Sequence, residues 1–216
     1  EGYTYHALDI TNPTQVNDVL GSTKPQVVIN TAAMTNVDAC EDDKAGCDAL
    51  NVTAVEYLVQ ACADNNIHLV HLSTDFIFDG ENGPYREEDD AKPLSYYGES
   101  KLKAEAIIRE SEISWAILRT VLVYGVAEAM SRSNIVLWAK GALEKGQNIN
   151  VVDDQFRTPT LAEDLADGCI LAAKQKAQGI YNISGEEYMS IIVLVRKVGE
   201  FWKLDTSLIS PVSSTT

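Results

Sequence analysis

The feature that most constrains the fold is a regular alternation between short apolar runs and longer helical patterns. The short runs are continuous and rich in β-branched residues, which is typical of strands covered on both faces. They are residues 26–30 (QVVIN), 67–73 (IHLVHLS), 115–120 (WAILRT), 149–153 (INVVD) and 179–184 (GIYNIS), with a further β-rich stretch at 3–10 (YTYHALDI). The main helical patterns fall at 97–110, 134–145, 161–175 and 190–203. Strands that alternate with helices of about 10–15 residues predict an α/β fold with βαβ crossovers and a parallel sheet covered by helices.

Charge and cysteine content narrow the classes of function. The chain carries a formal net charge of −15, which disfavours a general binder of nucleic acid or of anionic membranes, because phosphates attract Lys and Arg. No apolar run approaches the roughly 18–20 residues that a membrane span requires. The cysteines form no CxxC pair and have no His-rich neighbourhood, so the sequence predicts no zinc site and buried thiols in a reducing cytosol. They are Cys40, Cys47, Cys62 and Cys169.

Parallel sheets bind their ligands beyond the carboxyl ends of the strands. The candidate positions are therefore Asp9, the stretch after Asn30, Ser73–Asp75 and the stretch after Thr120. The segment 79–95 (DGENGPYREEDDAKPLS) is dense in Gly, Pro and carboxylates, which predicts a loop between the third of these positions and the next helix.

One helix carries a candidate proton donor. Tyr97 and Lys101 are four residues apart, which places both side chains on one helical face. A nearby ammonium favours the phenolate and lowers the phenol pKa, so the hydroxyl can exchange a proton near neutral pH. Thr74 could hold a carbonyl oxygen beside that phenol. The alternatives stay open: chance supplies roughly half such a Tyr–Lys pair in a chain of this composition, and Ser73–Asp75 also suits a simple turn or cap.

Several segments, in order along nearly the whole chain, resemble the extended short-chain dehydrogenase/reductases, and most closely their dTDP-4-dehydrorhamnose reductase branch. They are VVINTAAMTNVDACE (27–41), LNVTA (50–54), HLSTDFIFDG (71–80), GPYREED (83–89), PLSYYGESKLKAE (93–105), ILRTVLVYG (117–125) and DDQFRTPT (153–160). The resemblance implies a Rossmann-like, doubly wound parallel sheet and a smaller C-terminal substrate lobe. Residues 1–125 would form a partial NAD(P)-binding domain, and 126–216 would contribute the substrate lobe and the remaining Rossmann elements.

The resemblance also implies NAD(P)H-dependent reduction of a nucleotide-linked 4-keto deoxy sugar, as in dTDP-L-rhamnose synthesis, with NADPH or NADH as cofactor. Tyr97 would protonate the keto oxygen, Thr74 would orient it, and Lys101 would hold the nicotinamide ribose and tune Tyr97. The implied cofactor-binding residues are Asp9, Ile10, Ala32, Ala33, Met34, Ser73, Tyr97, Lys101, Thr120 and Val121. The implied substrate-binding residues are Asp75, Asn134, Gln155 and Arg157. A homodimer is a further hypothesis.

Arg157 is the candidate for the nucleotide diphosphate, because a guanidinium fork matches phosphate oxygens. A surface ion pair with Asp153 or Asp154 is the alternative. Two other departures from the reductase pattern matter: DQFRTPT and GPYREED look more like the branch with the regulatory β-subunit of methionine adenosyltransferase, and Met34 stands where an aromatic residue is common. A non-catalytic, nucleotide-binding regulatory subunit is therefore the second hypothesis. A dehydratase or epimerase is a weaker third, since position 76 is Phe where dehydratases usually have Glu.

A dinucleotide-binding fold needs a Gly-rich turn after its first strand, so that the backbone can approach the pyrophosphate. No glycine here lies in GxGxxG or GxxGxxG after a strand. We expect the first βα unit, on the order of forty residues, upstream of Glu1, and the family's final segment beyond residue 216.

Overall fold

The computed structural model describes residues 2–126 and 134–214. The chain divides into two compact units, each described by itself. The first consists of Glu1–Arg119 and Gly168–Asn182, and the second of Thr120–Asp167 and Ile183–Thr216.

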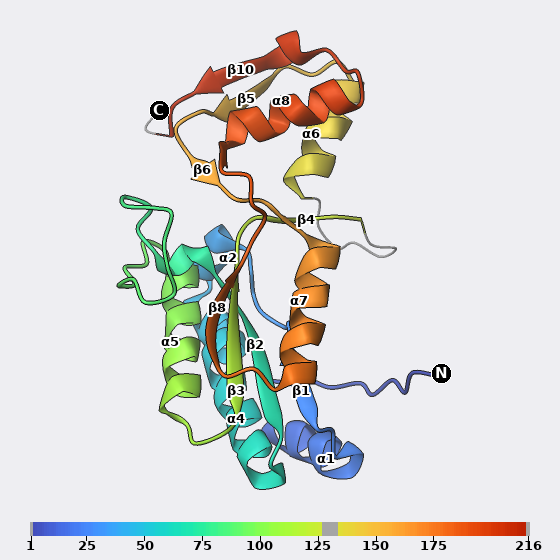
Figure 1. The fold of residues 1–216 in the computed structure, drawn as a ribbon, viewed down its shortest axis with the longest axis vertical. Coiled ribbons are helices and arrows are strands. Elements are labelled where there is room, and N and C mark those ends of the chain that lie inside the picture. The colour runs from blue at the N-terminus through green and yellow to red at the C-terminus, as the bar shows by residue number, and fades with distance from the viewer. Residues whose placement is uncertain (1, 127–133, 215–216) are drawn as a thin grey trace. The chain divides into compact units, whose positions relative to one another are not determined.

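The first unit is built on a four-stranded sheet in the order β1-β2-β3-β8 (Figure 1). Its strands are β1 (Val27–Asn30), β2 (His68–Thr74), β3 (Trp115–Thr120) and β8 (Gly179–Ile183). β1 and β2 are parallel, with Val27 opposite His68 and Asn30 opposite His71. The predicted α/β fold with a parallel sheet is therefore confirmed, and the predicted strand at 115–120 matches β3 at both ends.

Helices pack on this sheet through apolar faces. They are α1 (Pro13–Thr23), α2 (Val37–Asp42), α3 (Lys44–Asp48), α4 (Ala54–Asn65), α5 (Tyr96–Glu110) and the part of α7 (Ala162–Gln175) from Gly168 onward, with a π-helical turn η1 (Ala49–Thr53) and a 3₁₀ turn η2 (Asp75–Ile77). The core joins helical and strand side chains that are almost fully buried: Val16, Leu20, Leu58, Cys62, Leu69, Ile108 and Ile117. All four cysteines are buried and free, as the sequence predicted for thiols.

The β-rich stretch at 3–10 forms no strand. Tyr3 and Tyr5 are 103% and 89% exposed, and no described strand pairs with this stretch. β propensity reflects packing on a pleated, half-buried surface, so the composition of the stretch alone could not make it a strand. The chain turns after it, where Asn12 caps α1 by accepting hydrogen bonds from the N–H groups of Thr14 and Gln15.

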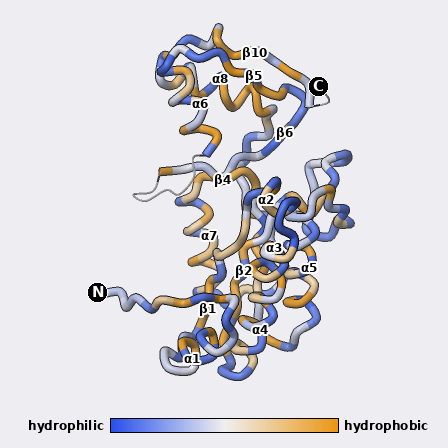
Figure 2. Tube along the Cα trace, turned by 180° about the vertical axis from the view of Figure 1, so that it is seen from behind, coloured by the Kyte–Doolittle hydropathy of each residue, from blue (hydrophilic) through white to orange (hydrophobic). Residues whose placement is uncertain are grey.

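The second unit has its own core. The parallel pair β5 (Ile149–Val152) and β10 (Ile209–Val212) packs with α6 (Ile135–Glu144) and α8 (Ile191–Phe201), and hydrophobic positions recur along β10 and α8 in Figure 2. Two short pairs complete the unit, together with a 3₁₀ turn η3 (Thr206–Leu208): β4 (Val123–Tyr124) pairs with β7 (Thr160–Leu161), and β6 (Phe156–Arg157) with β9 (Met189–Ser190). None of the helices in the described part of the chain is both long and apolar enough to span a membrane.

Candidate functional site

The candidate site begins where β2 ends. Thr74 is the last residue of β2 and the N-cap of η2. Its Oγ1 accepts a hydrogen bond from the N–H of Phe76 at 3.2 Å and donates to Oδ1 of Asp75 at 3.3 Å. These contacts hold the hydroxyl at the carboxyl end of a central strand, where parallel sheets place their ligands.

A glycine allows α5 to start against η2. Ser95 caps α5 by accepting a hydrogen bond from the N–H of Gly98 at 3.2 Å. A Cβ on Gly98 would lie 2.2 Å from the carbonyl oxygen of Phe76 and 3.0 Å from Cβ of Pro93. Only glycine fits this approach, and the approach brings Tyr97, the preceding residue, next to Thr74.

Tyr97 is buried, with 8% of its surface exposed, and lies beside Thr74, whose side chain lowers the Tyr97 pKa. Its ring packs edge-to-face on Phe76, with ring centroids 5.7 Å apart. Burial raises the pKa of Tyr97 to about 12; the Thr74 hydroxyl opposes this shift, and the nearby Asp75 carboxylate adds to it. The phenol therefore stays protonated at neutral pH.

Lys101 lies on the same helix and is 2% exposed. Its Nζ donates to the carbonyl oxygen of Leu72 at 2.7 Å and lies 3.0 Å from Nε2 of His71. Burial lowers the pKa of Lys101 to about 8, against the opposing charges of Glu105 and Cys47. The predicted lowering of the Tyr97 pKa by the Lys101 ammonium is not seen in this structure, because the desolvation of the phenol dominates.

Hydrogen bonds of one asparagine connect the segment after β1 to α5. Asn51, on the π-helical turn, accepts from the Met34 N–H at 2.7 Å and donates to the Met34 carbonyl at 3.0 Å. Its amide also donates to the hydroxyl of Ser100 on α5 at 2.9 Å, and Ser100 donates to the carbonyl of Tyr97 at 2.7 Å. Met34 is thereby fixed to the helix that carries Tyr97. π-helical turns often mark functional sites.

A buried ion pair supports α5 from the side of β3. Arg119 donates to both carboxylate oxygens of Glu105, at 3.0 and 2.7 Å, and both side chains are nearly inaccessible. Ser73 donates to the same carboxylate at 2.6 Å. Ser73, a predicted cofactor residue, thus has a structural partner in this structure.

The other predicted cofactor residues fall in both units. In the first, Asp9 accepts from the backbone and hydroxyl of Thr11, which lower its pKa, and Ile10 packs on the core. Ala32 is exposed, whereas Ala33 and Met34 are half-buried. In the second, both Thr120 and Val121 bond to the hydroxyl of Thr160. Thr120 Oγ1 donates to that hydroxyl at 3.3 Å, and the hydroxyl donates to the Val121 carbonyl at 2.7 Å.

The predicted substrate residues also divide between the units. Asp75 accompanies Thr74 in the first. In the second, Asn134 caps α6 through Oδ1 and donates to the carbonyl of Gly125 at 2.7 Å. Gln155 is half-buried, and Nη1 of Arg157 donates to the carbonyl of Phe156 at 2.7 Å. Their binding roles stay predictions.

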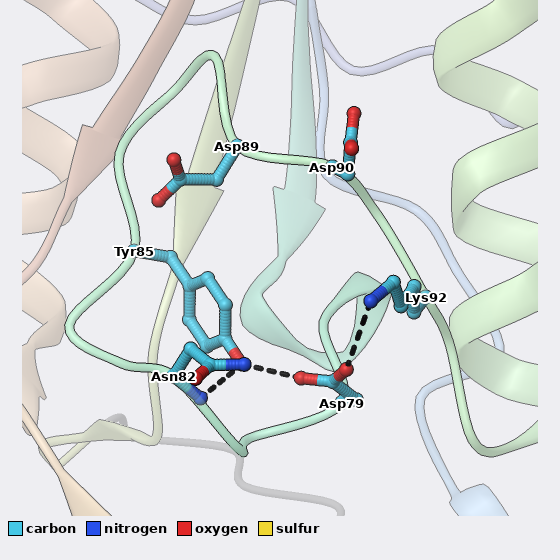
Figure 3. A pocket seen from close by; sticks show the side chains of 6 residues that line it. All are labelled: Asp79, Asn82, Tyr85, Asp89, Asp90 and Lys92. Carbon is cyan, nitrogen blue, oxygen red and sulfur yellow. Dashed lines mark hydrogen bonds and ion pairs between the residues drawn. The ribbon is translucent and has the colours of Figure 1, made fainter.

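A pocket of about 230 Å³ lies in the loop 79–95 (Figure 3). Its lining residues are Asp79, Asn82, Tyr85, Asp89, Asp90 and Lys92. Tyr85 donates to Asp79 at 2.5 Å, and Lys92 lies 3.8 Å from the same carboxylate. None of the predicted site residues lines this pocket. Across the described residues, no group of three or more His, Cys, Asp or Glu side chains could hold a metal ion.

Sequence reasoning missed the polar residues that hold the site: Asn30, Asn51, His71, Glu105 and Arg119. The available signal was a polar residue inside an apolar strand run, as with Asn30 in QVVIN, His71 in IHLVHLS and Arg119 in WAILRT. Buried polar groups need partners, so such residues point to an internal network.

A parallel sheet whose strand end carries a threonine hydroxyl, close to a phenol one turn before a buried lysine on the next helix, is the architecture of the extended short-chain dehydrogenase/reductases. Residues 2–216 match the model of the RmlD substrate binding domain, and the chain belongs to that family.

Solved and curated relatives cover almost the whole chain. A dTDP-4-dehydrorhamnose reductase from Bacillus anthracis str. Ames in complex with NADP superposes with a TM-score of 0.91 at 28% identity, covering 96% of this chain and 73% of that one. The dTDP-4-dehydrorhamnose reductase of Aggregatibacter actinomycetemcomitans is 35% identical over 194 residues, which is 86% of this chain and 64% of the relative. Methionine adenosyltransferase 2 subunit beta of Xenopus laevis is 29% identical over 214 residues, which is 97% of this chain and 64% of the relative. The chain therefore spans less than two thirds of the length of these two curated relatives.

Proposed function

We propose that the protein uses NADPH or NADH to reduce the C4 keto group of a nucleotide-linked deoxy sugar, as the dTDP-4-dehydrorhamnose reductases it is similar to do. One observation carries this proposal: the buried Tyr97 hydroxyl lies close enough to Thr74, at the carboxyl end of β2, for the Thr74 side chain to lower the Tyr97 pKa. Two hydroxyls so placed can converge on a single carbonyl oxygen.

The protonation states suit the reducing direction. When a carbonyl takes up hydride, its oxygen becomes a strongly basic alkoxide that needs a proton. Tyr97 keeps its proton at neutral pH because burial raises its pKa to about 12, so it is the donor in this mechanism. Thr74 holds the oxygen in line with the phenol. A bound nicotinamide would supply the hydride.

The segment after β1 fits the cofactor role proposed for it. Ala32 is exposed at the carboxyl end of β1, and the backbone of Met34 is held in place by Asn51. Small side chains on a fixed backbone permit the close approach of a flat ring or a ribose. Lys101, behind Tyr97 on the same helical face, would contact that ribose.

The test uses protein made from its full coding sequence, dTDP-4-dehydrorhamnose, and NADPH or NADH, with oxidation followed by absorbance. Removing a positioned proton donor typically costs 10²–10⁴-fold in rate, so Tyr97→Phe should lose roughly that much turnover. Tyr96→Phe is the matched control, because the neighbouring hydroxyl bonds to Asp48 at 2.6 Å instead, and it should keep turnover within a few-fold. Equal turnover in wild type and Tyr97→Phe would refute the proposal.

The second candidate is a non-catalytic regulatory subunit. It is supported by the similarity to methionine adenosyltransferase 2 subunit beta and by the DQFRTPT segment. Size-exclusion chromatography with a methionine adenosyltransferase catalytic subunit distinguishes the two. A stable complex, combined with no reduction of any keto sugar, would favour regulation.

A further inference from the structure

A chain of hydrogen bonds runs behind the candidate site from the backbone after β1 to Lys101. The N–H of Ala32 donates to Oδ1 of Asn30 at 3.1 Å. This bond fixes the orientation of the Asn30 amide, because a backbone N–H cannot face the amide nitrogen. The Asn30 NH₂ group therefore points at Nδ1 of His71, 3.1 Å away, and donates to it.

His71 must then carry its proton on the other ring nitrogen. The ring is 1% exposed, and burial lowers its pKa well below the usual value. A neutral imidazole has one N–H and one lone pair. Since Nδ1 accepts from Asn30, the proton sits on Nε2, which faces Nζ of Lys101 at 3.0 Å.

This arrangement fits only an uncharged Lys101. An ammonium has three donors and no lone pair, so a charged Nζ would direct a proton at the Nε2–H of His71. A neutral amine accepts from Nε2–H and still donates to the carbonyl of Leu72 at 2.7 Å. Every group in the chain then has a matched partner.

We propose that Asn30 and His71 are positioning residues that set the protonation state of Lys101. With His71 protonated on Nε2, Lys101 is a neutral amine. Lys101 takes a proton from solvent only when His71 carries its single proton on Nδ1 instead and the Asn30 amide turns to accept it, which breaks the bond to the Ala32 N–H. The charge of Lys101 is thereby coupled to the backbone after β1.

The charges that surround Lys101 still allow its pKa to fall in an experimentally accessible range. Glu105 on α5 and Cys47 on α3 act on Lys101, and Glu105 is already paired with Arg119 on β3. Burial outweighs them and lowers the Lys101 pKa to about 8. Both protonation states of Lys101 can therefore be populated in ordinary buffers. The bearing on catalysis rests on the proposed function, since a charged Lys101 would stabilise the phenolate that remains after Tyr97 gives up its proton.

The tautomer of His71 is measurable without turnover, so failure here is distinct from failure of the proposed function. The experiment is a pH series, from about 6.5 to 10, of long-range ¹H–¹⁵N spectra of the ¹⁵N-labelled chain, which has three histidines. His68→Gln and His71→Gln assign the signals. His71 should be the Nε2–H form above the Lys101 pKa and change to Nδ1–H as Lys101 charges, whereas His68, bonded to Ser114 at 2.6 Å, should not follow that titration. A His71 tautomer that stays constant while Lys101 titrates would overturn the proposal.

Asn30→Asp is designed to reverse the direction of the hydrogen bonds that run from residue 30 through His71 to Lys101. A carboxylate accepts from both the Ala32 N–H and His71 Nδ1–H, which leaves Nε2 to accept from a Lys101 ammonium. The Lys101 pKa, read from its Cε and Nζ shifts, should rise by at least about one unit toward the ordinary value near 10.4. Asn12→Asp, at the half-buried N-cap of α1, makes the same charge change and should leave the Lys101 pKa unchanged. An unchanged Lys101 pKa in a folded Asn30→Asp protein would also count against the proposal. If that variant does not fold, the pH series of the His71 tautomer in wild-type protein still tests the proposal.

Discussion

The close approach of α5 to η2 predicts an unusual response to Gly98→Ala. In most helices, glycine to alanine stabilises by about 1 kcal/mol, because alanine loses less backbone entropy. At Gly98 the new Cβ would lie 2.2 Å from the Phe76 carbonyl oxygen. Backbone cannot swing aside as a long side chain can, so α5 must move. Overpacking costs about 1–3 kcal/mol, and a contact this short belongs at or above the upper end. After the helical gain of about 1 kcal/mol, the net loss is about 2 kcal/mol or more.

Gly21→Ala is the matched control, because Gly21 lies in α1 of the same unit and a Cβ there meets nothing within 4 Å. Thermal unfolding followed by circular dichroism should show Gly98→Ala at least about 4 °C below wild type, with Gly21→Ala at or above it. The displaced helix should also separate Tyr97 from Thr74 and reduce any reductase turnover. A Gly98→Ala protein as stable as Gly21→Ala would refute the reasoning from the short contact.

Three further outcomes follow from buried groups. Arg119→Met strands the Glu105 carboxylate and should cost about 3–5 kcal/mol in urea unfolding, whereas Arg119→Met combined with Glu105→Leu should recover most of it; a double variant no better than the single would contradict the pairing. The pKa of His71 is lower folded than unfolded, so the unfolded state binds more protons just below pH 6.5; stability should be present above that pH and fall as the pH drops, and His71→Gln should flatten the profile. Burial raises the pKa of Cys62 to about 12, so a thiol reagent should label Cys62 slowly in native protein and fully in denaturant; rapid native labelling would contradict the buried thiol.

Much of the fold could be predicted because its signals are local. Continuous apolar runs bounded by turn residues located β1, β2, β3, β5 and β8 within about one residue of their observed ends. The segment 3–10 could not be predicted correctly, since its composition favours a strand but a strand also needs a neighbour to pair with.

The candidate site was predictable only in part. The spacing of Tyr97 and Lys101 placed them on one face of α5, and the end of β2 supplied Thr74. The direction of the pKa shifts was not readable from the sequence, because it depends on how deeply the helix packs and not on which residues are near in the chain. The partners of Lys101 come from β2, and those of Glu105 from β2 and β3. Such contacts form only after the strands have paired.

The two pKa shifts have one cause and together suggest how the site avoids carrying charge. Burial raises the pKa of an acid and lowers that of a base, so desolvation favours the neutral forms of both Tyr97 and Lys101. A neutral phenol beside an easily neutralised amine can give a proton to a substrate oxygen, but the phenolate it leaves needs a positive charge nearby. Lys101 can provide that charge only by giving up the hydrogen bond it accepts from His71. Proton donation by Tyr97 would therefore favour charging of Lys101 through simple electrostatics, and the Asn30–His71 pair would set how readily that second step occurs.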